Sequence, residues 1–149
     1  MGSVLLRHPI LSVLTLAYVA VVGWLTLSPQ AAPVNTSLLW RLAEVFARSS
    51  ATDWITFSLL EFLANVALFV PFGLLFVLLL GRRLWWLAIV LGVVATAAIE
   101  YAQQHIVGRV SDPRDLVANT TGAVLGALLA LAVTTAKARR IAAAREAAA

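Results

Sequence analysis

Acidic and amide side chains recur at helical spacing inside segments that are otherwise strongly apolar. Residues four apart share one face of a helix, and three such pairs occur: Glu61 with Asn65, Glu100 with Gln104, and Asp115 with Asn119. Gln103, three residues after Glu100, lies on the same face. Two carboxylates in apolar surroundings can form a general acid and base pair, and amides can hydrogen-bond a polar ligand. Both kinds of chemistry are open to these residues.

Other common catalytic groups are missing from the sequence. The chain has no cysteine, which excludes disulfides, thiolate metal ligands and cysteine nucleophiles. Of its two histidines, His105 is alone near the polar pairs, and His8 precedes the first apolar segment. No metal-binding motif, phosphate-binding glycine loop or Ser-His-Asp order occurs. We therefore expect no metal and no cofactor.

The segments that carry the polar pairs are long enough to cross a membrane. Hydrophobic residues make up 62% of the 149 residues and charged residues 12%, against about 25% charged in a soluble domain. A span takes about 20 apolar residues, and four stretches qualify: residues 10–27, 57–80, 85–104 and 116–135. We predict one all-α domain over residues 1–149, an integral membrane bundle of four transmembrane helices plus a short interfacial helix.

The positions of Lys and Arg predict the orientation of the bundle. The first span is expected to be retained, because its apolar run is longer than that of a usual signal peptide. With the N-terminus inside, seven basic residues lie on the inner side and four on the outer side. This excess favours a multi-pass topology with both termini inside. The basic residues are scattered between apolar runs, so the net charge of +4 does not indicate nucleic-acid binding.

Two segments outside the spans are predicted to be helical. Residues 38–48 place apolar side chains on one helical face and charged side chains on the other. This helix either lies in the outer membrane interface or packs over the end of the bundle. The Ala- and Arg-rich residues 137–149 are expected to continue the last span into the cytoplasm as a helix.

The polar pairs fall at the same end of three spans. Because successive spans run in opposite directions, Glu61, Glu100 and Asn119 should lie about 5 Å inside the outer boundary, with Asn65 about one turn deeper. Polar side chains that face lipid would lack hydrogen-bond partners, so these faces should point into the bundle. The inner halves of the same spans are almost entirely apolar. We therefore predict a polar pocket that opens outward.

Three further positions are predicted to shape the spans. Pro71 removes one backbone hydrogen bond in the middle of the second span and predicts a kink there. This kink either moves the outer half of the helix or has no functional role. Gly122 and Gly126 form a Gly-x-x-x-Gly pattern, which favours a close helix contact within the chain over a dimer contact.

The loop before the last span carries a predicted helix cap and two arginines. Asp112 is placed to cap the helix, with a proline at the first helical position and Asp115 at the third. Asp115 can therefore serve in the cap or in the pocket. A carboxylate buried at Glu100 needs a compensating cation or it will protonate, and Arg109 or Arg114 could reach back to supply the cation. Such an ion pair is either structural or part of a working site.

A longer pattern runs through the second to fourth spans and the loop between the last two. It reads Asn65-x-x-x-Phe69-x-Pro71-Phe72-Gly73, followed by Glu100-x-x-Gln103, Arg109, Asp115, Asn119 and Gly122. The pattern resembles that of the VanZ-like family of membrane proteins. The resemblance implies a small multi-pass protein of the bacterial cytoplasmic membrane. One relative is associated with antibiotic resistance, specifically to teicoplanin, a glycopeptide with a lipid tail.

Two functions fit these observations. In the first, the pocket binds a lipoglycopeptide or the head of a cell-envelope lipid, with Arg109 and Arg114 meeting an anionic group. In the second, an enzyme modifies a lipid-linked envelope precursor, with Glu100 and Asp115 as acid and base. A transporter is disfavoured, because the apolar inner half offers no polar route unless a homo-oligomer builds one. The expected partners are membrane lipid and one of these ligands.

Overall fold

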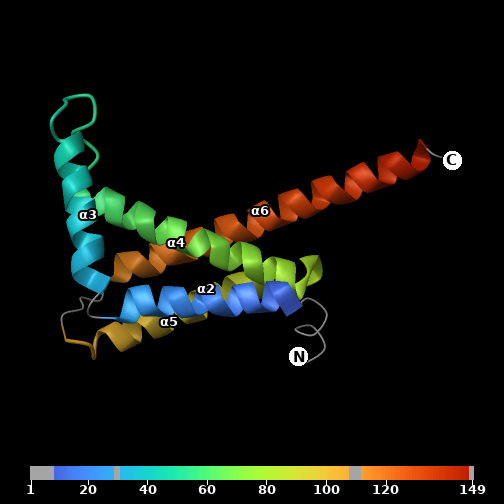
Figure 1. Ribbon diagram of the computed structural model, residues 1–149, viewed down its shortest axis with the longest axis horizontal. Helices are drawn as coiled ribbons and strands as arrows, with labels where there is room; N and C mark the ends of the chain where they lie inside the picture. The colour runs from blue at the N-terminus through green and yellow to red at the C-terminus, as the bar shows by residue number, and fades with distance from the viewer. Residues whose placement is uncertain (1–8, 29–30, 108–111, 148–149) are drawn as a thin grey trace.

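The computed structural model describes residues 9–28, 31–107 and 112–147, and these contain helices and turns but no strand. The bundle consists of helices α2, α4 and α5 together with the first part of α6, while α3 crosses one end of it (Figure 1). We call this the α3 end. The elements in chain order are α2 (Pro9–Leu27), α3 (Ala31–Phe46), α4 (Phe57–Leu80), the 3-10 turn η1 (Arg82–Leu84), α5 (Trp85–Gln103) and α6 (Pro113–Glu146).

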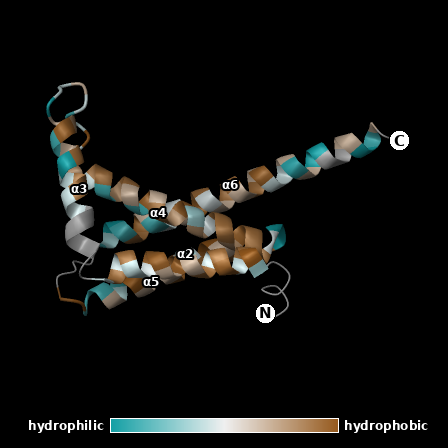
Figure 2. Cartoon of the chain, viewed as in Figure 1, coloured by the Kyte–Doolittle hydropathy of each residue, from teal (hydrophilic) through white to brown (hydrophobic). Residues whose placement is uncertain are grey.

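Within the part of the chain that the structure describes, four helical segments are long and apolar enough to cross a membrane. They are α2, α4, α6 and the segment Arg82–Gln103, which holds η1 and α5. Large apolar side chains stay exposed along them, among them Leu128 and Leu129 of α6 and Val94 of α5, and the apolar colour runs along the bundle in Figure 2. Exposure of this kind is unfavourable in water, whereas lipid solvates it. The predicted all-α membrane bundle is confirmed.

The ends of two spans follow from local sequence signals. Helix α4 begins after Thr56, whose side chain accepts a hydrogen bond from the backbone N–H of Leu59, and ends at Gly81 with a φ of 87°, a conformation that favours glycine. Helix α6 begins at Pro113, and the side chain of Asp112 accepts from the backbone N–H of Arg114 at 2.8 Å. Asp112 is therefore the N-cap that the sequence predicts.

Helix α3 is longer at its start and shorter at its end than the predicted helix over residues 38–48. The ring of Trp40 stacks on the ring of Phe57 at the first turn of α4, with 4.4 Å between the centroids. The side chains of Leu38, Leu42 and Val45 remain exposed. Helix α3 thus packs over the end of the bundle through Trp40, and its place in the membrane interface stays a prediction.

Helices α4 and α6 touch along a seam of glycines. A Cβ added at Gly126 would lie 1.9 Å from the carbonyl oxygen of Val70, and one at Gly122 would lie 2.2 Å from another carbonyl oxygen of α4. From the opposite side, a Cβ at Gly73 would lie 1.9 Å from the carbonyl oxygen of Ala123. Only glycine allows the two backbones to come this close. The Gly-x-x-x-Gly pattern therefore forms a contact within the chain.

Helix α2 is attached to α4 beside Pro71. This proline lies inside α4, which continues as a helix across it, so a functional role of the predicted kink stays a prediction. A proline offers no N–H, which leaves the carbonyl of Ala67 without its usual helical partner. The hydroxyl of Tyr18 donates a hydrogen bond to the next carbonyl, that of Leu68. Val22 of α2 joins the buried cluster formed with Phe69, Phe72 and Ala123.

Candidate functional site

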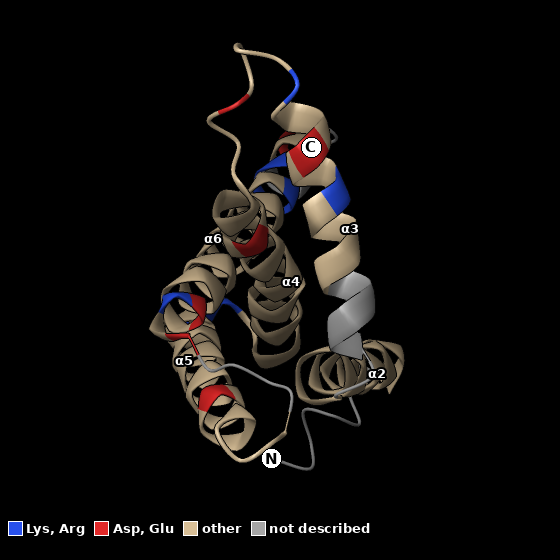
Figure 3. Ribbon diagram, turned by 90° about the vertical axis from the view of Figure 1, so that its left-hand side faces the viewer, with Lys and Arg blue, Asp and Glu red and all other residues tan. Residues whose placement is uncertain are grey.

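Polar side chains from three helices meet at the α3 end, which faces the viewer in Figure 3. Asn65 of α4 donates from Nδ2 to Oδ1 of Asp115, at the start of α6, over 2.6 Å. The charges of Glu61, Glu100 and Asp112 are close enough to act on that of Asp115. We use the name polar cluster for these five residues together with Arg114.

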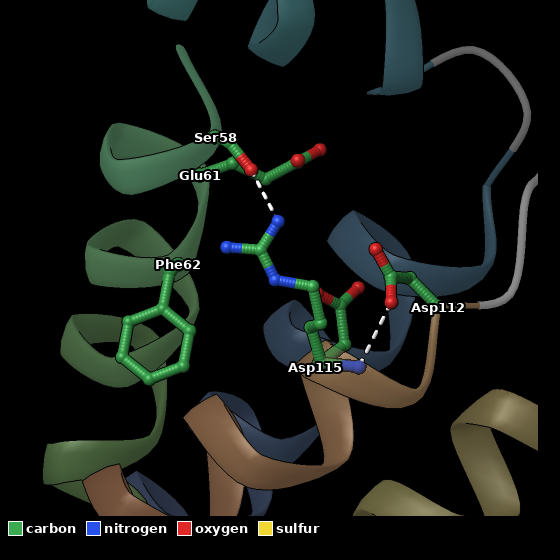
Figure 4. Close-up of a pocket in the computed structure, with 6 residues that line it drawn as sticks. Ser58, Glu61, Phe62, Asp112 and Asp115 are labelled. Atoms are coloured by element: carbon green, nitrogen blue, oxygen red, sulfur yellow. Dashed lines mark hydrogen bonds between the residues drawn. The ribbon is translucent and has the colours of Figure 1, made fainter. Parts of the chain in front are cut away.

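Part of the polar cluster lines a shallow depression in the surface. About 160 Å³ of empty space, some of it open to the surroundings, lies against Ser58, Glu61, Phe62, Asp112, Arg114 and Asp115 (Figure 4). Phe62 supplies an apolar wall beside the carboxylates. The side chains around it pack closely, so the depression is a feature of the surface and not a preformed cavity.

Arg114 reaches across to α4. Its guanidinium donates a hydrogen bond to Oγ of Ser58 (Figure 4), and its charge acts on Glu61. Arg114 is one of the two predicted partners of Glu100 in α5, but its side chain bonds to the first turn of α4. Arg109, the other arginine considered for that role, lies outside the described residues.

A second hydrogen bond lies one helical turn below the polar cluster. Asn119 donates from Nδ2 to Oγ1 of Thr96 over 2.9 Å, and the two side chains are 3% and 0% exposed. This bond joins α6 to α5, just as Asn65 and Asp115 join α4 to α6. Thr96 is not among the residues that the sequence predicts for the site. Its position four residues before Glu100, on the same face of α5, was the signal that could have found it.

Gln103 is buried but turned toward α2. Its Nε2 donates to the backbone carbonyl of Thr26 over 2.9 Å, near the end of α2. The neighbouring Gln104 is exposed, so Gln103 is the amide of this pair that packs inside. Its hydrogen bond places Gln103 in the contact between α5 and α2.

Two buried amide oxygens have unused hydrogen-bonding capacity. Within the described residues, neither Oε1 of Gln103 nor Oδ1 of Asn119 accepts a hydrogen bond. A buried acceptor without a donor costs about 1–3 kcal/mol. Among the described residues, no three His, Cys, Asp or Glu side chains are grouped where they could hold a metal ion. The two amide oxygens are therefore suited to accept a hydrogen bond from a donor group.

The fold and this cluster define a class: a multi-pass helical membrane protein whose polar side chains gather at one end of an apolar bundle. The chain matches the VanZ/LLP1 family over residues 15–134 and belongs to that family. No curated protein and no solved structure matches it. The family match contains α4, α5 and all residues of the polar cluster.

Proposed function

We propose that this protein binds the polar head of an amphipathic molecule of the bacterial cell envelope at the polar cluster. The convergence of carboxylate, amide and guanidinium groups from α4, α5 and α6 carries the proposal. Such groups are unfavourable within a membrane span and commonly mark functional sites. A few placed polar groups beside apolar walls such as Phe62 are typical of ligand sites. Lipoglycopeptides of the teicoplanin type and envelope lipids are the candidate ligands, and resistance to the former is the expected phenotype.

We also propose that the α3 end faces the outside of the cytoplasmic membrane, with both termini inside. Arg82 and Arg83 of η1 lie at the opposite end of the bundle (Figure 1). Helix α6 carries Lys137, Arg139, Arg140 and Arg145 near its other end. A concentration of basic residues of this kind favours the cytoplasmic side. In this orientation the polar cluster meets molecules of the outer leaflet.

Binding to the purified protein in lipid nanodiscs tests the proposal. Fluorescent teicoplanin and labelled envelope lipids are titrated onto the unmodified protein, the Glu100→Gln variant and the Glu44→Gln control, in which an exposed carboxylate of α3 is neutralised in the same way. Loss of a charged hydrogen-bonding group should weaken binding about tenfold or more. The control should bind as the unmodified protein does. Equal binding by all three proteins would remove the polar cluster as the site.

A membrane enzyme is the second candidate, and the interaction between the charges of Glu100 and Asp115 favours it. Two neighbouring carboxyl groups can divide the roles of acid and base in the modification of a lipid-linked envelope precursor. Mass spectrometry of envelope lipids from cells with and without the protein tests this reading. A new lipid product that Glu100→Gln abolishes would support the enzyme. Unchanged lipids would leave binding as the function.

A further inference from the structure

Acidic and basic side chains are distributed unequally between the two ends of the bundle. Six of the seven acidic residues of the chain lie at the α3 end or in the turn after α3 (Figure 3), namely Glu44, Asp53, Glu61, Glu100, Asp112 and Asp115. The seventh, Glu146, is the last residue of α6, which runs on past the bundle (Figure 1). The opposite end of the bundle, where η1 joins α4 to α5, carries Arg82 and Arg83. No carboxylate of the bundle therefore lies at the same end as these two arginines.

Arg82 and Arg83 are held on a short, closed turn. Gly81 ends α4 with a φ of 87°, and the backbone N–H of Leu84 donates to the carbonyl of Gly81 over 3.1 Å. Both arginine side chains are exposed. Within the part of the chain that the structure describes, neither guanidinium has a hydrogen-bond or ion-pair partner. Because each guanidinium carries five N–H donors and a permanent charge, the two together can bind an acceptor from outside the chain.

Two tryptophan rings follow the arginines directly. Trp85 and Trp86 begin α5, and their side chains are 39% and 51% exposed. Tryptophan at the end of a membrane span is typical of the interface, where its ring lies at the level of the lipid head groups. We use the name basic–aromatic patch for Arg82, Arg83, Trp85 and Trp86. The patch thus offers charged donors beside aromatic surface at the rim of the bundle.

We infer that the basic–aromatic patch binds the head group of an anionic phospholipid. A guanidinium can donate two parallel hydrogen bonds to the oxygens of a phosphate, while the tryptophan rings pack against the glycerol and the first acyl carbons. A zwitterionic head group carries its own cation, which opposes the approach of the arginines. A second copy of the chain is a poor occupant, because a symmetric contact would bring the same two arginines together. The inference is independent of the proposed function, since the polar cluster lies at the other end of the bundle.

Native mass spectrometry of the purified full chain tests the inference by counting bound lipids. The probes are phosphatidylglycerol and phosphatidylcholine with identical acyl chains, so that they differ in the head group alone. The test variant carries Arg82→Gln together with Arg83→Gln. Thermal unfolding in the same detergent verifies that this variant and the controls are folded.

Two controls separate a local site from attraction by net charge. Arg41→Gln with Arg48→Gln removes two exposed arginines at the α3 end and changes the net charge by the same amount. Lys137→Gln with Arg139→Gln removes two exposed basic residues from the part of α6 that runs past the bundle. A site at η1 requires that the test variant differ from both controls.

We expect the test variant to bind phosphatidylglycerol about 30-fold more weakly than the unmodified protein, because each basic residue beside an anionic head group contributes about fivefold. Its binding of phosphatidylcholine should be unchanged. Each control should lose less than about threefold, since distant exposed charges are screened. An equal loss in all three variants would overturn the site in favour of net charge. Equal binding of the two lipids by the unmodified protein would also overturn it, as would a dimer that the test variant abolishes.

Discussion

Asn65 and Asp115 are 50 residues apart in the sequence, and their side chains share a hydrogen bond of 2.6 Å. The bond joins the second transmembrane helix of the chain, α4, to the last, α6. It occupies one oxygen of Asp115, a residue that also lines the surface depression. In apolar surroundings a carboxylate needs such partners, because its desolvation is otherwise uncompensated. The pair therefore connects the packing of the bundle with the candidate site.

A double-mutant cycle on this pair should show that the two side chains stabilise the protein jointly, with a double-mutant cost smaller than the sum of the two single costs. Asn65→Ala and Asp115→Ala each remove one side of the hydrogen bond, so the second change should cost less once the first is made. The expected coupling is about 1 kcal/mol, the range found for hydrogen bonds between membrane helices. Reversible unfolding in detergent measures the free energies. Strictly additive effects would contradict a direct interaction.

Gly126→Ala should disrupt the contact between α4 and α6. The added methyl group would lie 1.9 Å from the carbonyl oxygen of Val70, so the helices must separate, at a cost of about 2 kcal/mol or more in the free energy of unfolding. Gly23→Ala is the matched control, since a Cβ at Gly23 meets nothing within 4 Å. That control should be neutral or slightly stabilising, because alanine is the better helix former. Equal melting temperatures of the two variants would refute the close contact.

Thr96→Val should destabilise the protein although it preserves the shape of the side chain. The change removes the acceptor of the buried amide of Asn119, and an unsatisfied buried group costs about 1–3 kcal/mol. Thr121→Val is the control, because among the described residues the hydroxyl of Thr121 bonds to the carbonyl of Val117 within its own helix at 2.7 Å. A loss of stability in the control as large as that in Thr96→Val would assign the effect to helix geometry.

Tyr18→Phe should loosen α2 from the rest of the bundle. The variant keeps the ring but loses the hydroxyl that bonds to the carbonyl of Leu68, which is worth about 0.5–1.5 kcal/mol. Hydrogen exchange in α2 should become faster, while exchange along the α4–α6 seam stays unchanged. Tyr101→Phe at the exposed end of α5 provides the comparison. Faster exchange throughout the bundle would mean that Tyr18 acts on global stability.

Single-cysteine labelling should report the proposed orientation. The chain has no cysteine of its own, so Ser49→Cys in the exposed turn after α3 and Ala144→Cys near the end of α6 carry no background. A membrane-impermeant maleimide should label Ser49→Cys in intact cells and Ala144→Cys after permeabilisation alone. The reverse pattern would place the polar cluster on the cytoplasmic side.

The spans could be predicted because the bilayer acts on composition and length. Helix α4 has the bounds expected for the second span, and the cap at Asp112 was predictable from its own side chain and the following proline. Signals of this kind are local. The gathering of polar residues at one end of the bundle was also predictable, because successive spans run in opposite directions and carry these residues at ends that lie on the same side.

Partner choice was not predictable in the same way. Arg114 was considered for Glu100 but bonds to Ser58, Gln103 bonds to the end of α2, and Thr96 had not been noticed. The spacing of Thr96 from Glu100 indicates the face of α5 on which its hydroxyl lies, but not which neighbouring amide is placed opposite it. Sequence alone thus determined a membrane bundle with polar groups at one end, because hydrophobicity and helical period are properties of single segments. Tertiary structure alone decided which groups pair, because the glycine seam between α4 and α6 fixes how each helix is rotated against the next.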